Sequence, residues 1–224
     1  MIDHPKNERA QALMAKVISA IDMPRYMELV RSWEPRSALG KKYIVDPSRT
    51  ASSASHTAVL LELDLPPIQR VLEVSAGAGF LALAAVLCGH SVFITDQSAE
   101  GMYNDFRRLF GVERSGHFLP FTLKKRKGSE PSDLVYTSNK LPSFGVQFDL
   151  IIAIALPPLA LFSVDDWRWF LQACVDCCPA GRLALWVHRC SRADRGKQAL
   201  LRLATPSIVT KNGMMVFETK DLLI

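Results

Sequence analysis

Residues 70–80 decide the fold: the apolar run Arg70-Val71-Leu72-Glu73-Val74 is followed by Ser75-Ala76-Gly77-Ala78-Gly79 and then by Phe80. The apolar run predicts a buried β-strand, and the glycine-rich stretch predicts a tight turn. A run rich in Ala and Leu, from Gly79 to Cys88, predicts a helix directly after the turn. Glycine lets a ligand approach the backbone closely, and a helix start offers free N–H groups. The stretch therefore predicts a nucleotide-type binding turn or, with no ligand, a tight strand-to-helix connection.

Two acidic residues narrow the class of ligand. Glu73 stands at the end of the strand, where its carboxylate would repel a pyrophosphate but would suit a cation. S-adenosylmethionine carries a sulfonium and an ammonium group and no phosphate. Asp96 follows the next predicted strand, Ser91 to Thr95, where an acid can bind both hydroxyls of a ribose. Glu73 favours S-adenosylmethionine, whereas Asp96 fits that cofactor and NAD equally.

Alternating strands and helices predict an α/β fold for most of the chain. Further strands are expected at 148–155 and 182–188, with helices at 99–110, 165–177 and 193–203. Apolar strands separated by helices predict a Rossmann-like doubly wound sheet that is mostly parallel. The turn at Asn212-Gly213 predicts a C-terminal antiparallel hairpin between 208–210 and 214–218. An insertion is expected at 113–141, where Leu134-Val135-Tyr136 suggests a third strand.

The first 50 residues lack the alternating strand and helix pattern of the rest of the chain. Helical spacing predicts N-terminal helices at 5–21 and 25–33, and the polar stretch 35–55 predicts a long loop over the site. A further helix is expected to begin at Ala54 or Ser55 and to end near Leu63. The expected division is therefore 1–50, N-terminal helices and cover loop, and 51–224, the cofactor-binding domain.

Composition bounds the class of protein. The chain has 224 residues, of which 49% are hydrophobic and 22% charged, as in an ordinary globular domain. The formal net charge of +5 permits an anionic partner without demanding one. No apolar run is long enough to span a membrane, and the charged start of the chain does not look like a secretion signal. With five cysteines, this predicts a cytoplasmic protein with reduced thiols and no membrane partner. Cys174, Cys177 and Cys178 fall in a predicted helix, which favours core packing over a metal site.

From Thr50 to Val187 the chain resembles the class I S-adenosylmethionine-dependent methyltransferases. The resemblance rests on the glycine turn, on Phe148-Asp149-Leu150-Ile151-Ile152, and on Pro179-Ala180-Gly181-Arg182-Leu183, all in the family's order. Ser75 replaces the family's first glycine. The resemblance implies an enzyme with a seven-stranded sheet, one antiparallel hairpin and S-adenosyl-L-methionine as cofactor. It also implies cofactor contacts. The methionine part would meet Glu73, Ser75, Ala76, Gly77 and Gly79; the ribose would meet Asp96; the adenine would meet Gln97 and either Asn139 or Ser138.

A narrower resemblance lies upstream. Tyr43-Ile44-Val45-Asp46, Ser53-Ala54-Ser55-His56 and Leu60-Leu61-Glu62-Leu63 resemble segments of the protein-L-isoaspartate O-methyltransferases. This implies O-methylation of a carboxylate, with Ser53 and His56 as catalytic residues. Ser55 stands where that family tends to have proline, and Asp96 where it has glutamate. Ser53 also fits the N-cap of the following helix, and His56 a plain helix residue.

Other functions stay open. Leu156-Pro157-Pro158-Leu159 lacks the polar and aromatic residues that amine methyltransferases often carry around two prolines. Residues 165–169 fit either a wall for the methyl acceptor or an ordinary helix start. A methyltransferase of RNA or another nucleic acid is an alternative because of two basic stretches, Lys124 to Lys127 and the set Arg189, Arg192, Arg195, Lys197 and Arg202. A nicotinamide-dependent oxidoreductase and a non-catalytic scaffold of the same fold are the remaining alternatives.

Overall fold

The computed structural model describes residues 4–33, 44–96, 101–112, 118–120, 123–125, 134–136, 141, 144–154, 159, 162–187, 193–210 and 213–222. The chain divides into two compact units. The first comprises Met1–Ile68, Ala76–Phe93 and Ser98–Phe118, and the second comprises Gln69–Ser75, Ile94–Gln97 and Leu119–Ile224. The expected boundary between residues 50 and 51 rests on sequence pattern rather than on contacts, and it stays a prediction.

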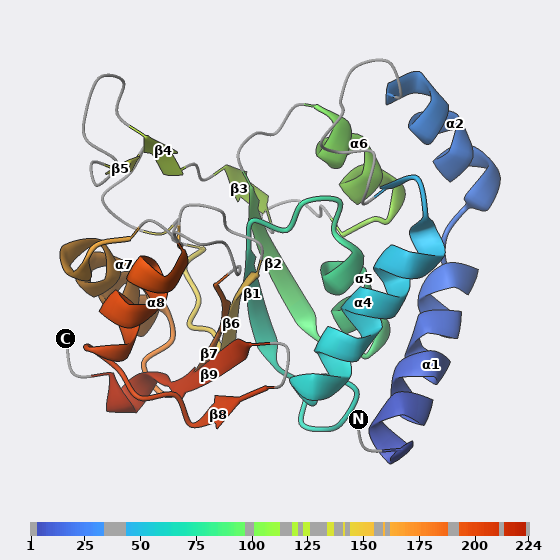
Figure 1. Cartoon of the computed structure of the whole chain (residues 1–224). Helices are drawn as coiled ribbons and strands as arrows, with labels where there is room; N and C mark the ends of the chain where they lie inside the picture. The colour runs from blue at the N-terminus through green and yellow to red at the C-terminus, as the bar shows by residue number, and fades with distance from the viewer. Residues whose placement is uncertain are drawn as a thin grey trace. The chain divides into compact units, whose positions relative to one another are not determined.

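The described strands form a seven-stranded sheet in the order β3-β2-β1-β6-β7-β9-β8 (Figure 1). Its members are β1 (Arg70–Val74), β2 (Ser91–Asp96), β3 (Phe118–Pro120), β6 (Leu150–Ile154), β7 (Arg182–Trp186), β8 (Ile208–Val209) and β9 (Met214–Glu218). β6 runs parallel to both β1 and β7, whereas β9 runs antiparallel to both β7 and β8. The predicted α/β sheet, with parallel strands and a C-terminal antiparallel hairpin, is confirmed.

A second, two-stranded sheet lies in the predicted insertion. β4 (Leu123–Lys125) pairs antiparallel with β5 (Leu134–Tyr136). The strand expected at 134–136 is therefore present, but it pairs with β4 instead of joining the main sheet. The third strand of the main sheet in chain order is β3, a strand of 3 residues at the edge of the sheet that the sequence analysis did not single out.

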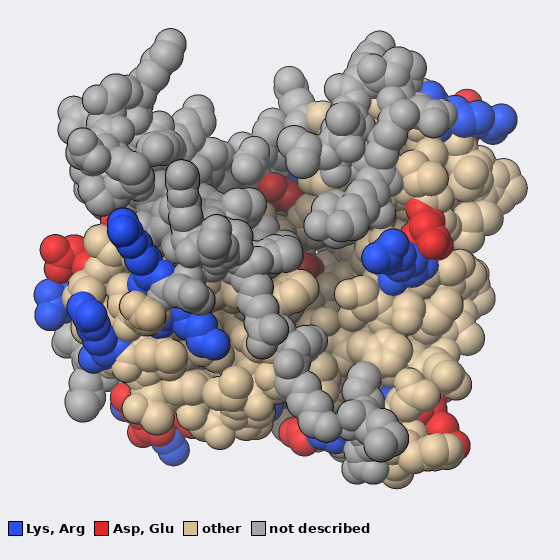
Figure 2. Space-filling model, in the orientation of Figure 1, with Lys and Arg blue, Asp and Glu red and all other residues tan. Residues whose placement is uncertain are grey.

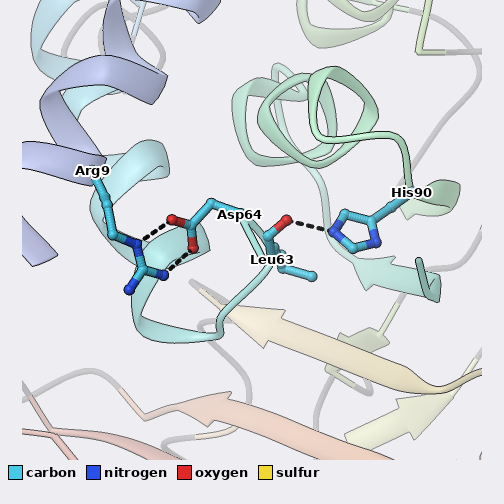
Figure 3. Close-up of polar contacts among 4 residues, drawn as sticks. All are labelled: Arg9, Leu63, Asp64 and His90. Carbon is cyan, nitrogen blue, oxygen red and sulfur yellow. Dashed lines mark hydrogen bonds and ion pairs between the residues drawn. The ribbon is translucent and has the colours of Figure 1, made fainter. Parts of the chain in front are cut away.

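Five helices are described in the first unit: α1 (His4–Ser19), α2 (Met23–Trp33), α4 (Pro47–Leu60), α5 (Phe80–Leu87) and α6 (Met102–Leu109). α1 packs on α4 and α5, and α4 also packs on α5. Figure 3 shows how the segment after α4 is held. Arg9 of α1 donates to both carboxylate oxygens of Asp64, at 2.5 and 2.6 Å. Nε2 of His90 donates to the carbonyl oxygen of Leu63 at 2.5 Å.

The start of α4 corrects the predicted loop at 35–55. The helix begins at Pro47, because the side chain of Asp46 accepts from the backbone N–H of Arg49 at 3.0 Å and proline suits the first helical position. Residues 47–55 are therefore helical, while 34–43 lie outside the described residues. Ser53 is inside the helix, so the reading of Ser53 as its N-cap is wrong.

Aromatic rings join α2 to α5 and α6. Tyr26 of α2 is fully buried and packs against Phe80, Phe106 and Phe110. Its hydroxyl donates to the carbonyl oxygen of Ile44 at 2.6 Å. Burial disfavours the charged phenolate, and this raises the pKa of Tyr26 well above its ordinary value.

The second unit contains α7 (Val164–Cys177), α8 (Ala193–Leu201) and the short 3-10 helix η2 (Thr219–Asp221). α7 starts with a capping box, in which Ser163 and Asp166 satisfy each other's backbone N–H groups. Trp167 is fully buried, and its indole N–H donates to the carbonyl oxygen of Gly196 at 2.6 Å. Of the two readings of 165–169, the geometry favours the helix start. No helix within the described ranges is long and apolar enough to cross a membrane.

Candidate cofactor-binding site

The turn after β1 is built from left-handed backbone. The φ angles of Ser75, Gly77 and Gly79 are +63°, +54° and +84°. The N–H of Gly79 donates to the carbonyl oxygen of Ala76 at 2.9 Å, and Gly79 is the N-cap of α5. Non-glycine residues seldom adopt such angles. Ser75 thus keeps the backbone conformation that favours the glycine expected by resemblance.

The two glycines of the turn have different surroundings. A Cβ at Gly77 would meet no atom of the described residues within 4 Å. A Cβ at Gly79 would lie 3.0 Å from Cγ2 of Val112 and 3.1 Å from Cγ of Arg107. Among the described residues nothing fills the space beside Gly77, so a ligand could approach the backbone there. Gly79, by contrast, is needed for close packing against the end of α6.

Arg107 of α6 was missed in the sequence analysis. Only 1% of its surface is exposed, and its Nη1 donates to the carbonyl oxygen of Gly77 at 2.7 Å. Arginine is almost never buried so deeply without polar partners. Helical spacing places Arg107 on one face of α6 with Tyr103, Phe106 and Phe110, whereas its exposed neighbour Arg108 lies off that face. An arginine at an apolar-face position is thus the sequence signal that separates the two.

Both predicted acids are buried at the ends of adjacent strands. Glu73 is the penultimate residue of β1 and Asp96 is the last residue of β2, and each has 7% of its surface exposed. β1 and β2 are hydrogen-bonded neighbours in the sheet. Carboxylates are costly to bury, so two of them at neighbouring strand ends indicate a polar function for this part of the sheet.

The predicted catalytic residues both lie on α4. Ser53 is exposed, and His56 is partly buried. Nδ1 of His56 donates to the carbonyl oxygen of Ser52 at 2.8 Å, and its Nε2 lies 3.2 Å from Oδ1 of Asn7 on α1. The ring of His56 therefore links α1 to α4. Ser53 and His56 belong to the first unit, whereas Glu73 and Asp96 belong to the second.

Several predicted site residues fall outside the described ranges. These are Gln97, Asn139 and its alternative Ser138, together with the Pro157-Pro158 pair. Their predicted roles stay predictions.

Of the three cysteines for which core packing is predicted, Cys174 and Cys178 lie in the core, whereas Cys177 is only partly buried. Cys174 and Cys178 are fully buried. Burial raises the pKa of Cys174 well above that of a free thiol and raises the pKa of Cys178 to about 11. Within the described part of the chain, no three His, Cys, Asp or Glu side chains are grouped so that they could hold a metal ion.

Two of the similar solved structures are matched over nearly their whole length. PH0226 protein from Pyrococcus horikoshii OT3 superposes with a TM-score of 0.51 at 13% identity, covering 80% of this chain and 98% of that one. A TehB-like SAM-dependent methyltransferase from Corynebacterium glutamicum gives 0.47 at 14% identity, covering 88% and 99%. The glycopeptide N-methyltransferase MtfA gives 0.41 at 16% identity, covering 60% and 52%.

The chain has a Rossmann-like α/β fold, similar to that of PH0226. At these identities the likeness establishes the fold alone. The chain spans about half the length of MtfA, 52% of it. No protein-family model and no curated protein sequence matches the chain.

Proposed function

We propose that this protein is an S-adenosylmethionine-dependent methyltransferase. The observation that carries the proposal is the buried Glu73, separated by one residue from the left-handed turn in which no described atom crowds Gly77. An anionic strand end followed by an approachable backbone suits a ligand that joins a cationic group to a polar amino-acid tail. Asp96, buried at the end of the neighbouring strand, supplies an acceptor pair for the hydroxyls of a ribose.

The residues present fit this cofactor better than a dinucleotide. A pyrophosphate next to the carboxylate of Glu73 would be repelled, and the repulsion would be strong at a buried position. The ammonium and sulfonium groups of S-adenosylmethionine would be attracted instead. We therefore propose that Glu73, Ser75, Ala76, Gly77 and Gly79 hold the methionine part, that Asp96 holds the ribose, and that Gln97 and Asn139 flank the adenine.

Methyl transfer requires little acid–base catalysis by the protein. The cofactor, when bound, supplies a methyl group on a positively charged sulfur. The residues of the chain position this group in line with the acceptor and keep water away. Binding and orientation by the turn and the two acids therefore account for most of what this site has to do.

For the acceptor we propose an ionised carboxylate of a protein or a small molecule. A carboxylate is already a nucleophile at neutral pH, so a hydroxyl that donates a hydrogen bond is enough to orient it. Ser53 offers an exposed hydroxyl on α4, and His56 follows it by three positions, on the same side of the helix. Because the ring of His56 is engaged with Ser52 and Asn7, its proposed contribution is to hold this face of α4 in place.

One observation favours RNA as a second candidate acceptor. Arg195 and Arg202 are exposed and Lys197 is partly exposed, all on α8 or just after it. Figure 2 shows Lys and Arg side chains gathered over this part of the second unit. Cations grouped in this way can bind phosphates.

The cofactor is tested by calorimetric titration of the purified protein with S-adenosylmethionine, S-adenosylhomocysteine and NAD. We expect micromolar binding of the first two and none of NAD. Asp96→Ala and Glu73→Gln should weaken binding at least tenfold, whereas Asp176→Ala, at an exposed acid of α7, should not. Absence of binding by the wild-type protein would reject the proposal, and binding of NAD instead would favour the oxidoreductase.

The acceptor is tested by transfer of a radiolabelled methyl group to isoaspartyl peptides and to RNA. We expect a base-labile methyl ester on the peptides, and its formation should fall in Ser53→Ala but not in Ser48→Ala, at an exposed serine of the same helix. Label in RNA that is lost on substituting Arg195 and Arg202 would favour the second candidate. Cofactor binding without transfer to either acceptor would favour the scaffold.

A further inference from the structure

The side chain of Arg107 contacts both glycines of the turn. Its aliphatic stem passes Gly79, where Cγ lies 3.1 Å from the position of an added Cβ. Its guanidinium donates from Nη1 to the carbonyl oxygen of Gly77 at 2.7 Å. The whole side chain is buried, with 1% of the surface of Arg107 exposed. One residue of α6 thus spans a turn that lies 30 positions earlier in the chain.

This contact sets the direction of one peptide plane. Pro66–Pro67 is the cis peptide bond identified in the described residues, so the bond between Gly77 and Ala78 is trans. In a planar trans peptide the C=O and the N–H point in opposite directions. Because Arg107 holds the carbonyl of Gly77, the N–H of Ala78 points away from α6. A hydrogen bond from a charged donor is among the stronger ones, so this orientation is held firmly.

We propose that Arg107 is a positioning residue that presents the N–H of Ala78 to the carboxylate of the cofactor's methionine part. This rests on the proposed function, since it assumes S-adenosylmethionine at the turn. Among the described residues, the Gly77 side of the turn leaves room for a ligand to approach the backbone. A merely structural arginine would support the fold without preferring one part of the ligand over another.

The test compares two ligands that differ in the amino-acid part. S-adenosylhomocysteine carries the carboxylate, whereas 5′-methylthioadenosine keeps the adenosine and the sulfur and lacks it. Dissociation constants are measured by calorimetry for the wild type, Arg107→Met, Arg107→Lys and Arg107→Gln. Arg108→Met is the matched control, because it removes the same charge from the adjacent, exposed position of α6.

We expect Arg107→Met to weaken the binding of S-adenosylhomocysteine about tenfold or more, because one charged hydrogen bond is lost. The affinity for methylthioadenosine should change by no more than about twofold. Arg107→Lys and Arg107→Gln keep a donor and should recover part of the affinity. Arg108→Met should bind both ligands as the wild type does. Circular dichroism and thermal unfolding establish that each variant is folded.

Three outcomes would overturn the assignment. One is a folded Arg107→Met with unchanged affinity for S-adenosylhomocysteine, and another is an equal loss for both ligands. If Arg107→Met does not fold, Arg107→Gln decides: an equal loss of affinity for both ligands there would make Arg107 purely structural. If the wild-type protein binds neither ligand, the proposed function itself is rejected. This outcome differs from all three above.

Discussion

At the level of single residues, Gly77 and Gly79 share a left-handed backbone but differ in what a side chain would meet. An alanine at either position carries the strain of positive φ, about 1–2 kcal/mol. At Gly79 a Cβ also lies 3.0 Å from Val112 and 3.1 Å from Arg107, closer than ordinary contacts. We expect Gly79→Ala to lower the free energy of unfolding more than Gly77→Ala, as measured by urea titration.

The variants Gly77→Ala and Gly79→Ala should also differ in their affinity for the cofactor. The Cβ of Gly77→Ala would occupy the open space that we assign to the cofactor. Gly77→Ala should therefore weaken the binding of S-adenosylhomocysteine by more than the small loss of stability of this variant explains. A Gly77→Ala variant that is less stable than Gly79→Ala would contradict the described packing.

At the level of elements, the turn before β7 depends on Gly181. A Cβ there would lie 2.8 Å from the carbonyl carbon of Asp149, and closer still to its oxygen and to Sγ of Cys178. That carbonyl oxygen accepts from the N–H of Arg182 at 3.0 Å, so it cannot move without disturbing the start of β7. We expect Gly181→Ala to destabilise the protein by more than about 3 kcal/mol, or to abolish soluble expression.

Gly145→Ala is the control for that substitution. Gly145 also has positive φ, at +71°, but no described atom lies within 4 Å of the added Cβ. Its loss should be limited to backbone strain, about 1–2 kcal/mol. Equal losses at the two positions would show that the crowding at Gly181 is relieved by relaxation.

The start of α4 gives a second prediction at this level. Asp46→Ala removes the acceptor for the N–H of Arg49 and should lower the free energy of unfolding by about 1 kcal/mol. Asp46→Asn keeps a capping oxygen and should retain most of the stability. Urea titration of the three proteins measures the difference, and an Asn variant as unstable as the Ala variant would argue against the cap.

At the level of the whole molecule, stability should fall in alkali. The pKa of buried Tyr26 is raised above its unfolded value of 10.0, and the pKa of Cys178 is raised from 9.0 to about 11. Both groups are neutral when protonated. Their contribution is therefore fully present below the unfolded pKa, and it is lost as the pH rises through the folded pKa. The urea midpoint should decline from about pH 9 upward.

Tyr26→Phe isolates one part of this effect. The variant loses the hydrogen bond to Ile44, so it should be less stable at pH 8 by about 1 kcal/mol. It should then lose less further stability than the wild type between pH 9 and about 11. Tyr103→Phe, at a partly exposed tyrosine of α6, is the matched control. An unchanged decline in Tyr26→Phe would show that the phenol ionises without unfolding.

Local signals explain how much of the fold could be predicted. β1, the glycine turn and α5 follow one another within a few residues, and each leaves its own pattern in the sequence. The misplaced start of α4 was also a local matter. Asp46 followed by Pro47 is a usual helix start, but the serine-rich stretch after it favours a loop.

The sequence by itself determined the α/β class, the C-terminal hairpin and the positions of Glu73, Ser75, Gly77, Gly79 and Asp96, because these depend on neighbours along the chain. Only the tertiary structure decided what touches the turn and the helices. Arg107 meets Gly77 across 30 positions, and His56 meets Asn7 across 49. Such contacts arise from the packing of whole helices, and periodicity carries no record of which distant residue a side chain will reach. Helical spacing places Arg107 on the apolar face of α6, but only the packing of α6 against the turn decides that its partner is Gly77.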